Sequence, residues 1–175
     1  DVRAYSPHTA CMILRLRPIP NGLKPFSLPY LIATWFQSGR IRPASGSWGS
    51  LAALPFCWAI KMYTGQFGLL VFAVLVGIIG TWAVNYYLEH THTEDPSEVV
   101  IDEVLGMALL FFALPAHDWR WIVAGFVLFR ILDSLKPGPI GWCDKHIKGA
   151  RGVMCDDIVA GMIAALSVAA IQSLI

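Results

Sequence analysis

Five carboxylates lie near the ends of strongly apolar segments of the sequence. They are Asp102, Glu103, Asp133, Asp156 and Asp157. Ionisable groups at such positions are unfavourable in a membrane, and they usually face the interior of a helix bundle or a water-filled cavity. Carboxylate oxygens are also the ligands that Mg²⁺ prefers in proteins. The five residues are therefore candidate metal ligands, and the alternative is that they only anchor helix ends at the membrane surface.

Basic residues accompany these carboxylates. Arg130 lies within an apolar run, three positions before Asp133, so that the two side chains can pair along one helix. Lys136, Lys148 and Arg151 follow in the polar segment after that run. Guanidinium and ammonium groups bind phosphate, the guanidinium through a bidentate fork. A divalent-cation site with cations beside it favours chemistry on a phosphate group.

A glycine- and serine-rich segment, 38–50, leads directly into an apolar run. Glycines allow close approach of the backbone, and the N-terminus of a helix offers unpaired N–H groups that favour an anion. Taken alone this is a weak indication, because such segments usually only turn the chain and cap the helix. The candidate phosphate-binding residues in it are Ser38, Gly46, Ser47, Gly49 and Ser50.

The composition indicates a membrane protein. Of 175 residues, 56% are hydrophobic and 14% are charged, and the mean hydropathy is +0.58, whereas a soluble domain has about 25% charged residues. The formal net charge of +1 provides no global field for nucleic acid, so we expect no nucleic-acid partner. We expect a poorly ordered arm over residues 1–25 and a single helical membrane domain over residues 26–175.

Hydropathy patterning predicts an all-α fold, a multispanning helical membrane bundle of about five apolar helices plus an N-terminal interfacial helix at 26–37. A break is expected at Tyr63, Thr64 and Gly65, and a polar loop is expected from 136 to about 151. The predicted apolar helices cover residues 51–62, 66–88, 99–115, 119–135 and 153–175.

Alternating crossings of these helices would bring the segments 38–50, 89–103 and 133–157 to one face of the membrane. All five candidate metal ligands lie in these segments. The positive-inside rule places that face in the cytoplasm, because most of the basic residues outside the arm belong to it.

Small residues predict close contact between two of the helices. Glu103 lies near Gly106, and Asp157 shares a helix face with Gly161. Small residues on facing helices allow close approach in membranes. We therefore expect the two carboxylates to converge on one ion.

Motifs of several other hydrolases are absent from the sequence, including the GxSxG elbow and the GxxxxGK[ST] phosphate loop. The main alternative to an enzyme that acts on phosphate is a small ion-coupled transporter, because membrane-embedded carboxylates also mark ion paths. Transporters often carry inverted repeats and charges that reach both faces, and neither feature is visible here. A non-catalytic membrane scaffold is a further alternative.

Four blocks occur in the order and spacing of a known family. They are GSWGSLAALPF (46–56), VIDEVLGM (100–107), WIVAGFVLFRILDSLKPGPI (121–140) and GVMCDDIVAGMIAAL (152–166). Over roughly residues 30–170 the chain resembles phosphatidylglycerophosphatase A, a bacterial Mg²⁺-dependent membrane enzyme. Ser47 stands where the family commonly has threonine, whereas Gly46 and Gly49 are retained.

The resemblance implies hydrolysis of the terminal phosphomonoester of phosphatidylglycerophosphate, a phospholipid, to phosphatidylglycerol and phosphate. It implies Mg²⁺ as cofactor and a multi-pass enzyme among the lipids of the bacterial inner membrane, with its active site on the cytoplasmic face. The implied catalytic residues are Glu103, Asp133, Asp157 and Arg130, and the implied cationic partner is Lys136.

Overall fold

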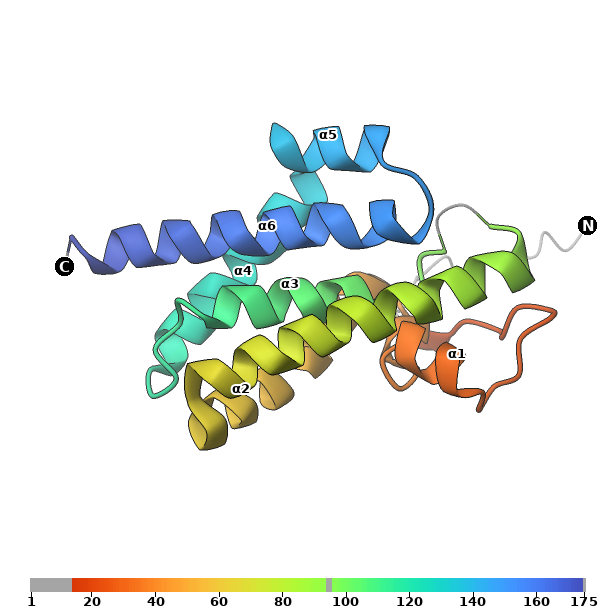
Figure 1. Ribbon diagram of the computed structural model, residues 1–175, viewed down its shortest axis with the longest axis horizontal. Helices are drawn as coiled ribbons and strands as arrows, with labels where there is room; N and C mark the ends of the chain where they lie inside the picture. Colours follow the sequence, from red (N-terminus) through yellow and green to blue (C-terminus); the bar gives the residue numbers. More distant parts are fainter. Residues whose placement is uncertain (1–13, 94–95, 175) are drawn as a thin grey trace, which may run out of the picture.

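The computed structural model describes residues 14–93 and 96–174, and it is mostly helical, as the sequence predicts (Figure 1). Six helices and two very short strands occur among these residues. Their order is β1 (Arg15–Leu16), α1 (Leu28–Ala33), the 3-10 turn η1 (Ser38–Arg40), β2 (Ile41–Arg42), α2 (Ser45–Thr91), α3 (Ile101–Phe111), α4 (Trp119–Leu135), α5 (Pro139–His146) and α6 (Gly149–Gln172).

Helix α2 consists of two arms that meet at Gly65, where the chain reverses direction (Figure 1). Gly65 has φ 68° and ψ −160°, a backbone conformation that favours glycine. This confirms the break expected at residues 63–65. The first arm begins at Ser45 and not at residue 51, so the segment 38–50 is only partly a loop. Helical structure starts early because Gly46 and Gly49 let this turn pack directly against its neighbours.

Helix α3 is the central helix of the bundle, and nearly all of its residues are buried between α2 and α6. Its 11 residues extend about 16 Å at 1.5 Å per residue, about half the thickness of a bilayer core. The predicted crossing at 99–115 is therefore wrong in length. Among the described residues, two helices, α2 and α6, are long and apolar enough to cross a membrane. The predicted bundle of about five crossings is not confirmed.

The backbones of α3 and α6 touch at two glycines. A Cβ atom added to Gly161 would overlap the carbonyl oxygen of Gly106. A Cβ atom added to Gly106 would lie 2.9 Å from the carbonyl oxygen of Asp157 and 2.6 Å from the ring of Phe129. The close approach predicted from the small residues is confirmed, and it brings Glu103 and Asp157 to the same place.

The polar segment after α4 contains a helix that the sequence interpretation left as loop. Pro139 occupies the first turn of α5, where its missing N–H is not needed, and α5 packs on α6. The Sγ atoms of Cys143 and Cys155 lie 3.1 Å apart between the two helices. Helix α6 begins at Gly149 rather than near 153, so Asp156 and Asp157 lie about two turns inside it.

The N-terminal segments add a small extended element to the helices. Strand β1 pairs antiparallel with β2, so the fold is not purely helical. Helix α1 is shorter than the predicted 26–37 helix, and the buried Tyr30 on it stacks on Tyr87 of α2. Within the predicted arm, Leu23 is buried and the carbonyl of Arg17 accepts hydrogen bonds from Arg40. Residues 1–13 lie outside the described residues.

Lys61 holds the end of α3 at the pole of the bundle opposite the carboxylates. Its Nζ donates to the carbonyls of Phe111 at 2.6 Å and Leu114 at 2.5 Å. The Lys61→Met variant should therefore unfold at a lower temperature in detergent, because each unpaired buried carbonyl costs about 1–3 kcal/mol. Thermal unfolding followed by circular dichroism measures this. Exposed Lys24 provides the control, Lys24→Met, and equal melting temperatures for the two variants would contradict the assignment.

Candidate active site

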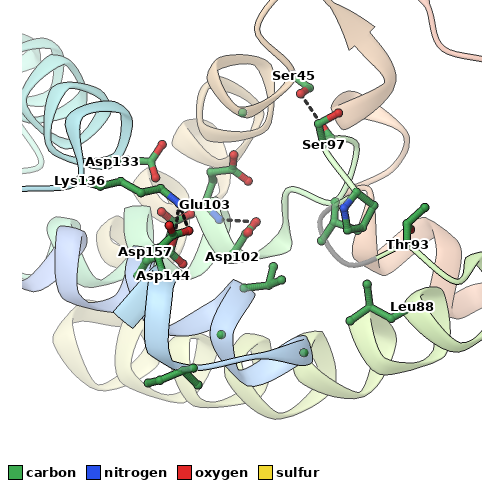
Figure 2. A pocket seen from close by; sticks show the side chains of 18 of the residues that line it. Ser45, Leu88, Thr93, Ser97, Asp102, Glu103, Asp133, Lys136, Asp144 and Asp157 are labelled. Carbon is green, nitrogen blue, oxygen red and sulfur yellow. Dashed lines mark hydrogen bonds and ion pairs between the residues drawn. The ribbon is translucent and has the colours of Figure 1, made fainter. Parts of the chain in front are cut away.

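A cavity of about 860 Å³ opens where the start of α2, the segment before α3, the end of α4, α5 and the start of α6 meet. The three segments that the sequence analysis placed on one face all line it, which confirms that grouping. Figure 2 shows the carboxylates gathered with Lys136 at one end and Ser45, Ser97 and Thr93 at the other.

The five predicted metal ligands form two overlapping groups. Carboxylate oxygens of Asp102, Glu103 and Asp157 lie within 4.8 Å of one another, and so do those of Asp133, Asp156 and Asp157. Asp157 belongs to both groups and is 3% exposed. Ionised carboxylates so close together repel strongly where water is largely excluded. The two groups could therefore hold a cation.

Three carboxylate oxygens of the cluster are buried and have no hydrogen-bond partner among the described residues. They are Oε2 of Glu103, Oδ1 of Asp156 and Oδ1 of Asp157. A buried, charged oxygen without a partner is strongly unfavourable, whereas the same oxygen is a good ligand for a hard cation. The donor set, all carboxylate oxygen, fits Mg²⁺ and contains no softer ligand.

Arg130 reaches into this cluster from α4. Its Nη1 atom lies 3.0 Å from Oδ2 of Asp133 and 3.8 Å from Oε1 of Glu103, and it donates to Oγ of Ser50 at 3.3 Å. The predicted pairing with Asp133 along α4 is confirmed. Gly46 lies against both side chains. A Cβ atom at this position would be 2.9 Å from Nη2 of Arg130 and would overlap Oε1 of Glu103. Glycine at 46 therefore lets α2 begin against the charged cluster.

Lys136 bridges two helices at the edge of the cavity. Its Nζ donates to Oδ1 of Asp144 at 2.5 Å and to Oδ2 of Asp156 at 2.7 Å. Burial by itself would lower the pKa of Lys136, but the hydrogen bonds to Asp144 and Asp156 outweigh burial and raise this pKa above its usual value. Lys136 therefore stays protonated. It pairs with Oδ2 of Asp156 and leaves Oδ1 of the same carboxylate without a partner among the described residues.

Five of the candidate phosphate-binding residues lie in or beside the cavity. Gly46, Lys136 and Lys148 line the cavity. Ser50 contacts Arg130 from α2, and Ser47 lines a neighbouring groove that also contains Arg130.

The other three candidates lie away from the cavity lining. Gly49 packs against Val100, where a Cβ atom would lie 2.5 Å from the valine Cβ. Ser38 donates to the carbonyl of Thr34. Arg151 is exposed on α6 and is not among the described residues that line the cavity.

The sequence analysis missed several residues of the cavity wall. Asp144 was left in a loop, although the Pro-Gly-Pro run before it is a helix-start signal that would have placed it on α5. Ser45, whose hydroxyl donates to the carbonyl of Ser97, joins the start of α2 to the segment before α3. That contact joins residues far apart in sequence and leaves no local signal.

Comparisons with known proteins agree with the geometry. The family model of phosphatidylglycerophosphatase A matches residues 31–172. Phosphatidylglycerophosphatase A of Escherichia coli is 43% identical over 137 residues, which are 78% of this chain and 78% of that protein. The protein of the same name from Haemophilus influenzae is 36% identical over 155 residues, covering 87% of this chain and 95% of that protein.

A relative with a different substrate in its name is also similar. A Bacteroides thetaiotaomicron protein with the provisional name phosphatidylinositol-3-phosphatase is 38% identical over 153 residues, covering 83% of this chain and 94% of that protein. No solved structure gives a significant match. The match of the family model to most of the chain, together with relatives above 30% identity over most of their length, shows that this chain belongs to the phosphatidylglycerophosphatase A family.

Proposed function

We propose that this protein is a lipid phosphatase that hydrolyses the terminal phosphomonoester of phosphatidylglycerophosphate to phosphatidylglycerol and inorganic phosphate. The observation that carries the proposal is the buried carboxylate cluster, with its unpaired oxygens, beside Arg130 in one cavity. Family membership supports the same reaction. The ion-coupled transporter considered above has no support from the relatives.

The five carboxylates would hold Mg²⁺, through the two groups that share Asp157. Bound there, Mg²⁺ would supply charge neutralisation for phosphate oxygens and a site that activates or orients water. The protein itself supplies the guanidinium of Arg130 in a fixed position. Glu103, Asp133 and Ser50 hold Arg130 in place, so that its remaining N–H groups can bind phosphate oxygens without reorganisation.

The hydrolysis joins a water oxygen to phosphorus and breaks the bond between phosphorus and the glycerol oxygen. The glycerol oxygen takes up a proton, and phosphate leaves. A carboxylate oxygen of the cluster that does not hold the cation is suited to accept the proton that water loses. Lys136 and Lys148 lie on the cavity wall, where their charges favour an anionic substrate.

The apolar outer surface suits a multi-pass protein in the bacterial inner membrane. Only 33% of the most apolar window of α2, and 39% of that of α6, is buried inside the protein, whereas a core helix of a soluble protein is mostly buried. Large apolar side chains such as Phe67, Val74 and Ile78 are exposed on α2. The positive-inside rule supports a cytoplasmic position for the cavity, because most basic residues outside the first 25 lie in the segments that line it or adjoin it.

Phosphate release from purified protein tests the function and the metal separately. With phosphatidylglycerophosphate and Mg²⁺ we expect steady phosphate release, which EDTA abolishes and added Mg²⁺ restores. The absence of phosphate release would contradict the substrate assignment, and release that persists in EDTA would contradict the metal assignment. Phosphatidylinositol 3-phosphate belongs in the same assay, because one relative carries that substrate in its name; we expect slower turnover with it.

A further inference from the structure

A second hollow, here called the α4 groove, lies on the outer side of α4 beside the start of α2 and has a volume of about 440 Å³. Its walls are mostly apolar and include Phe126, Val127, Ile131 and Leu135. Arg130 and Ser134 line both this groove and the active-site cavity. The two hollows therefore meet at the guanidinium that contacts the carboxylate cluster.

The α4 groove continues an exposed apolar ridge. Val123, Val127, Ile131 and Leu135 follow one another at intervals of four residues, and their exposed fractions are 52%, 47%, 48% and 74%. Residues four apart are neighbours on a helix surface, so they form a continuous strip along α4. The last three line the groove. An apolar path thus runs along α4 past Arg130 to the end of the helix.

We propose that the α4 groove receives the glycerol backbone and the first part of an acyl chain of the lipid substrate, which therefore enters the site sideways from the membrane. This inference rests on the proposed function. A phospholipid monoester carries an anionic head and apolar chains on one molecule, so its site must join a charged pocket to an apolar surface. The groove and the cavity meet that requirement at Arg130 and Ser134.

The polar groups at the junction fit this occupant. The exposed hydroxyl of Ser134 lies where the two hollows meet, next to Asp133 and Leu135 in sequence, and it can donate to an ester or phosphodiester oxygen. Ser47 supplies a second hydroxyl from the facing wall at the start of α2. Apolar walls beside one guanidinium and two hydroxyls match the part of the lipid where the acyl chains join the glycerol esters and the phosphodiester.

Kinetics of a groove-filling variant test the proposal. Ile131→Trp should raise KM for dioleoyl phosphatidylglycerophosphate at least tenfold in mixed micelles. Inorganic phosphate has no acyl chain and should bind in the cavity alone. Its inhibition constant should therefore stay within twofold of that of the unmodified protein. Val123→Trp is the matched control, because Val123 lies on the same ridge but outside the groove, and its KM should be unchanged. Equal KM values for the two variants would overturn the proposal.

Photolabelling of the unmodified protein provides a test that requires no substitution, so its result does not depend on whether a variant folds. A phosphatidylglycerophosphate analogue with a diazirine near the carbonyl end of one acyl chain should label residues within 126–135, and excess unlabelled substrate should suppress that labelling. Labelling confined to other helices would overturn the groove assignment even if the lipid is hydrolysed. Failure of the unmodified protein to hydrolyse the lipid would instead contradict the proposed function.

Discussion

Asp157→Asn should lower turnover of phosphatidylglycerophosphate at least about 100-fold at saturating Mg²⁺, a loss of about 2.7 kcal/mol in transition-state stabilisation. Asp157 is the one residue common to both carboxylate groups, and its Oδ1 is buried without a partner among the described residues. The amide keeps the shape of the side chain but removes a unit of negative charge and weakens a ligand for a hard cation.

The fold of the Asp157→Asn protein should survive, because the substitution removes one of several mutually repelling buried charges. Its melting temperature in EDTA should equal or exceed that of the unmodified protein. Exposed Glu89 does not line the cavity, so Glu89→Gln is a control for loss of charge alone, with normal turnover expected. Near-normal turnover of Asp157→Asn would show that the shared carboxylate is not a ligand that the reaction needs.

Glu103→Gln should also lower kcat at least about 100-fold, with a smaller change in KM. Glu103 contributes to one carboxylate group and lies 3.8 Å from Nη1 of Arg130. Arg130 keeps its closer partner, Asp133, at 3.0 Å, so the guanidinium should remain in position to bind phosphate. The expected defect is therefore in the chemical step, through loss of a metal ligand.

Steady-state kinetics separate these effects for Glu103→Gln. A rise in KM with kcat preserved would show that Glu103 acts only by holding Arg130, and it would contradict a role in metal binding. A Mg²⁺ titration provides a further check, because a lost ligand should raise the Mg²⁺ concentration that gives half-maximal activity. The Glu89→Gln variant should match the unmodified protein in both measurements.

Features that depend on helix periodicity were predictable from the sequence. The pairing of Arg130 with Asp133 follows from a three-residue spacing on one helix. The contact between Gly106 and Gly161 follows from small residues on two facing surfaces. The gathering of carboxylates at one pole follows from alternation of apolar and charged segments. In each case the information lies within one helix or in the order of the helices.

Features that depend on distant partners were not predictable in this way. Helix α3 ends at Phe111 rather than at Pro115. Lys61, some fifty positions earlier, donates to the carbonyl of Phe111 at that end and to the carbonyl of Leu114 just beyond it. Helix α2 begins at Ser45 because Gly46 can lie against Glu103 and Arg130, which belong to other helices. Apolar periodicity carries no information about these distant partners. It therefore predicts the start of α2 and the end of α3 several residues from their positions in the structure.

In the membrane location proposed above, the backbone contact between Gly106 and Gly161 has a mechanical consequence. A helix longer than the local thickness of the bilayer can adapt by tilting. A tilt of α6 turns about the place where its main chain touches α3, since no compressible side chain separates the two backbones there. Asp157 lies one helical turn from this fulcrum on α6, and Glu103 lies about one turn from it on α3. A change in the tilt of α6 should therefore alter the distance between the two carboxylates less than it moves the far end of the helix.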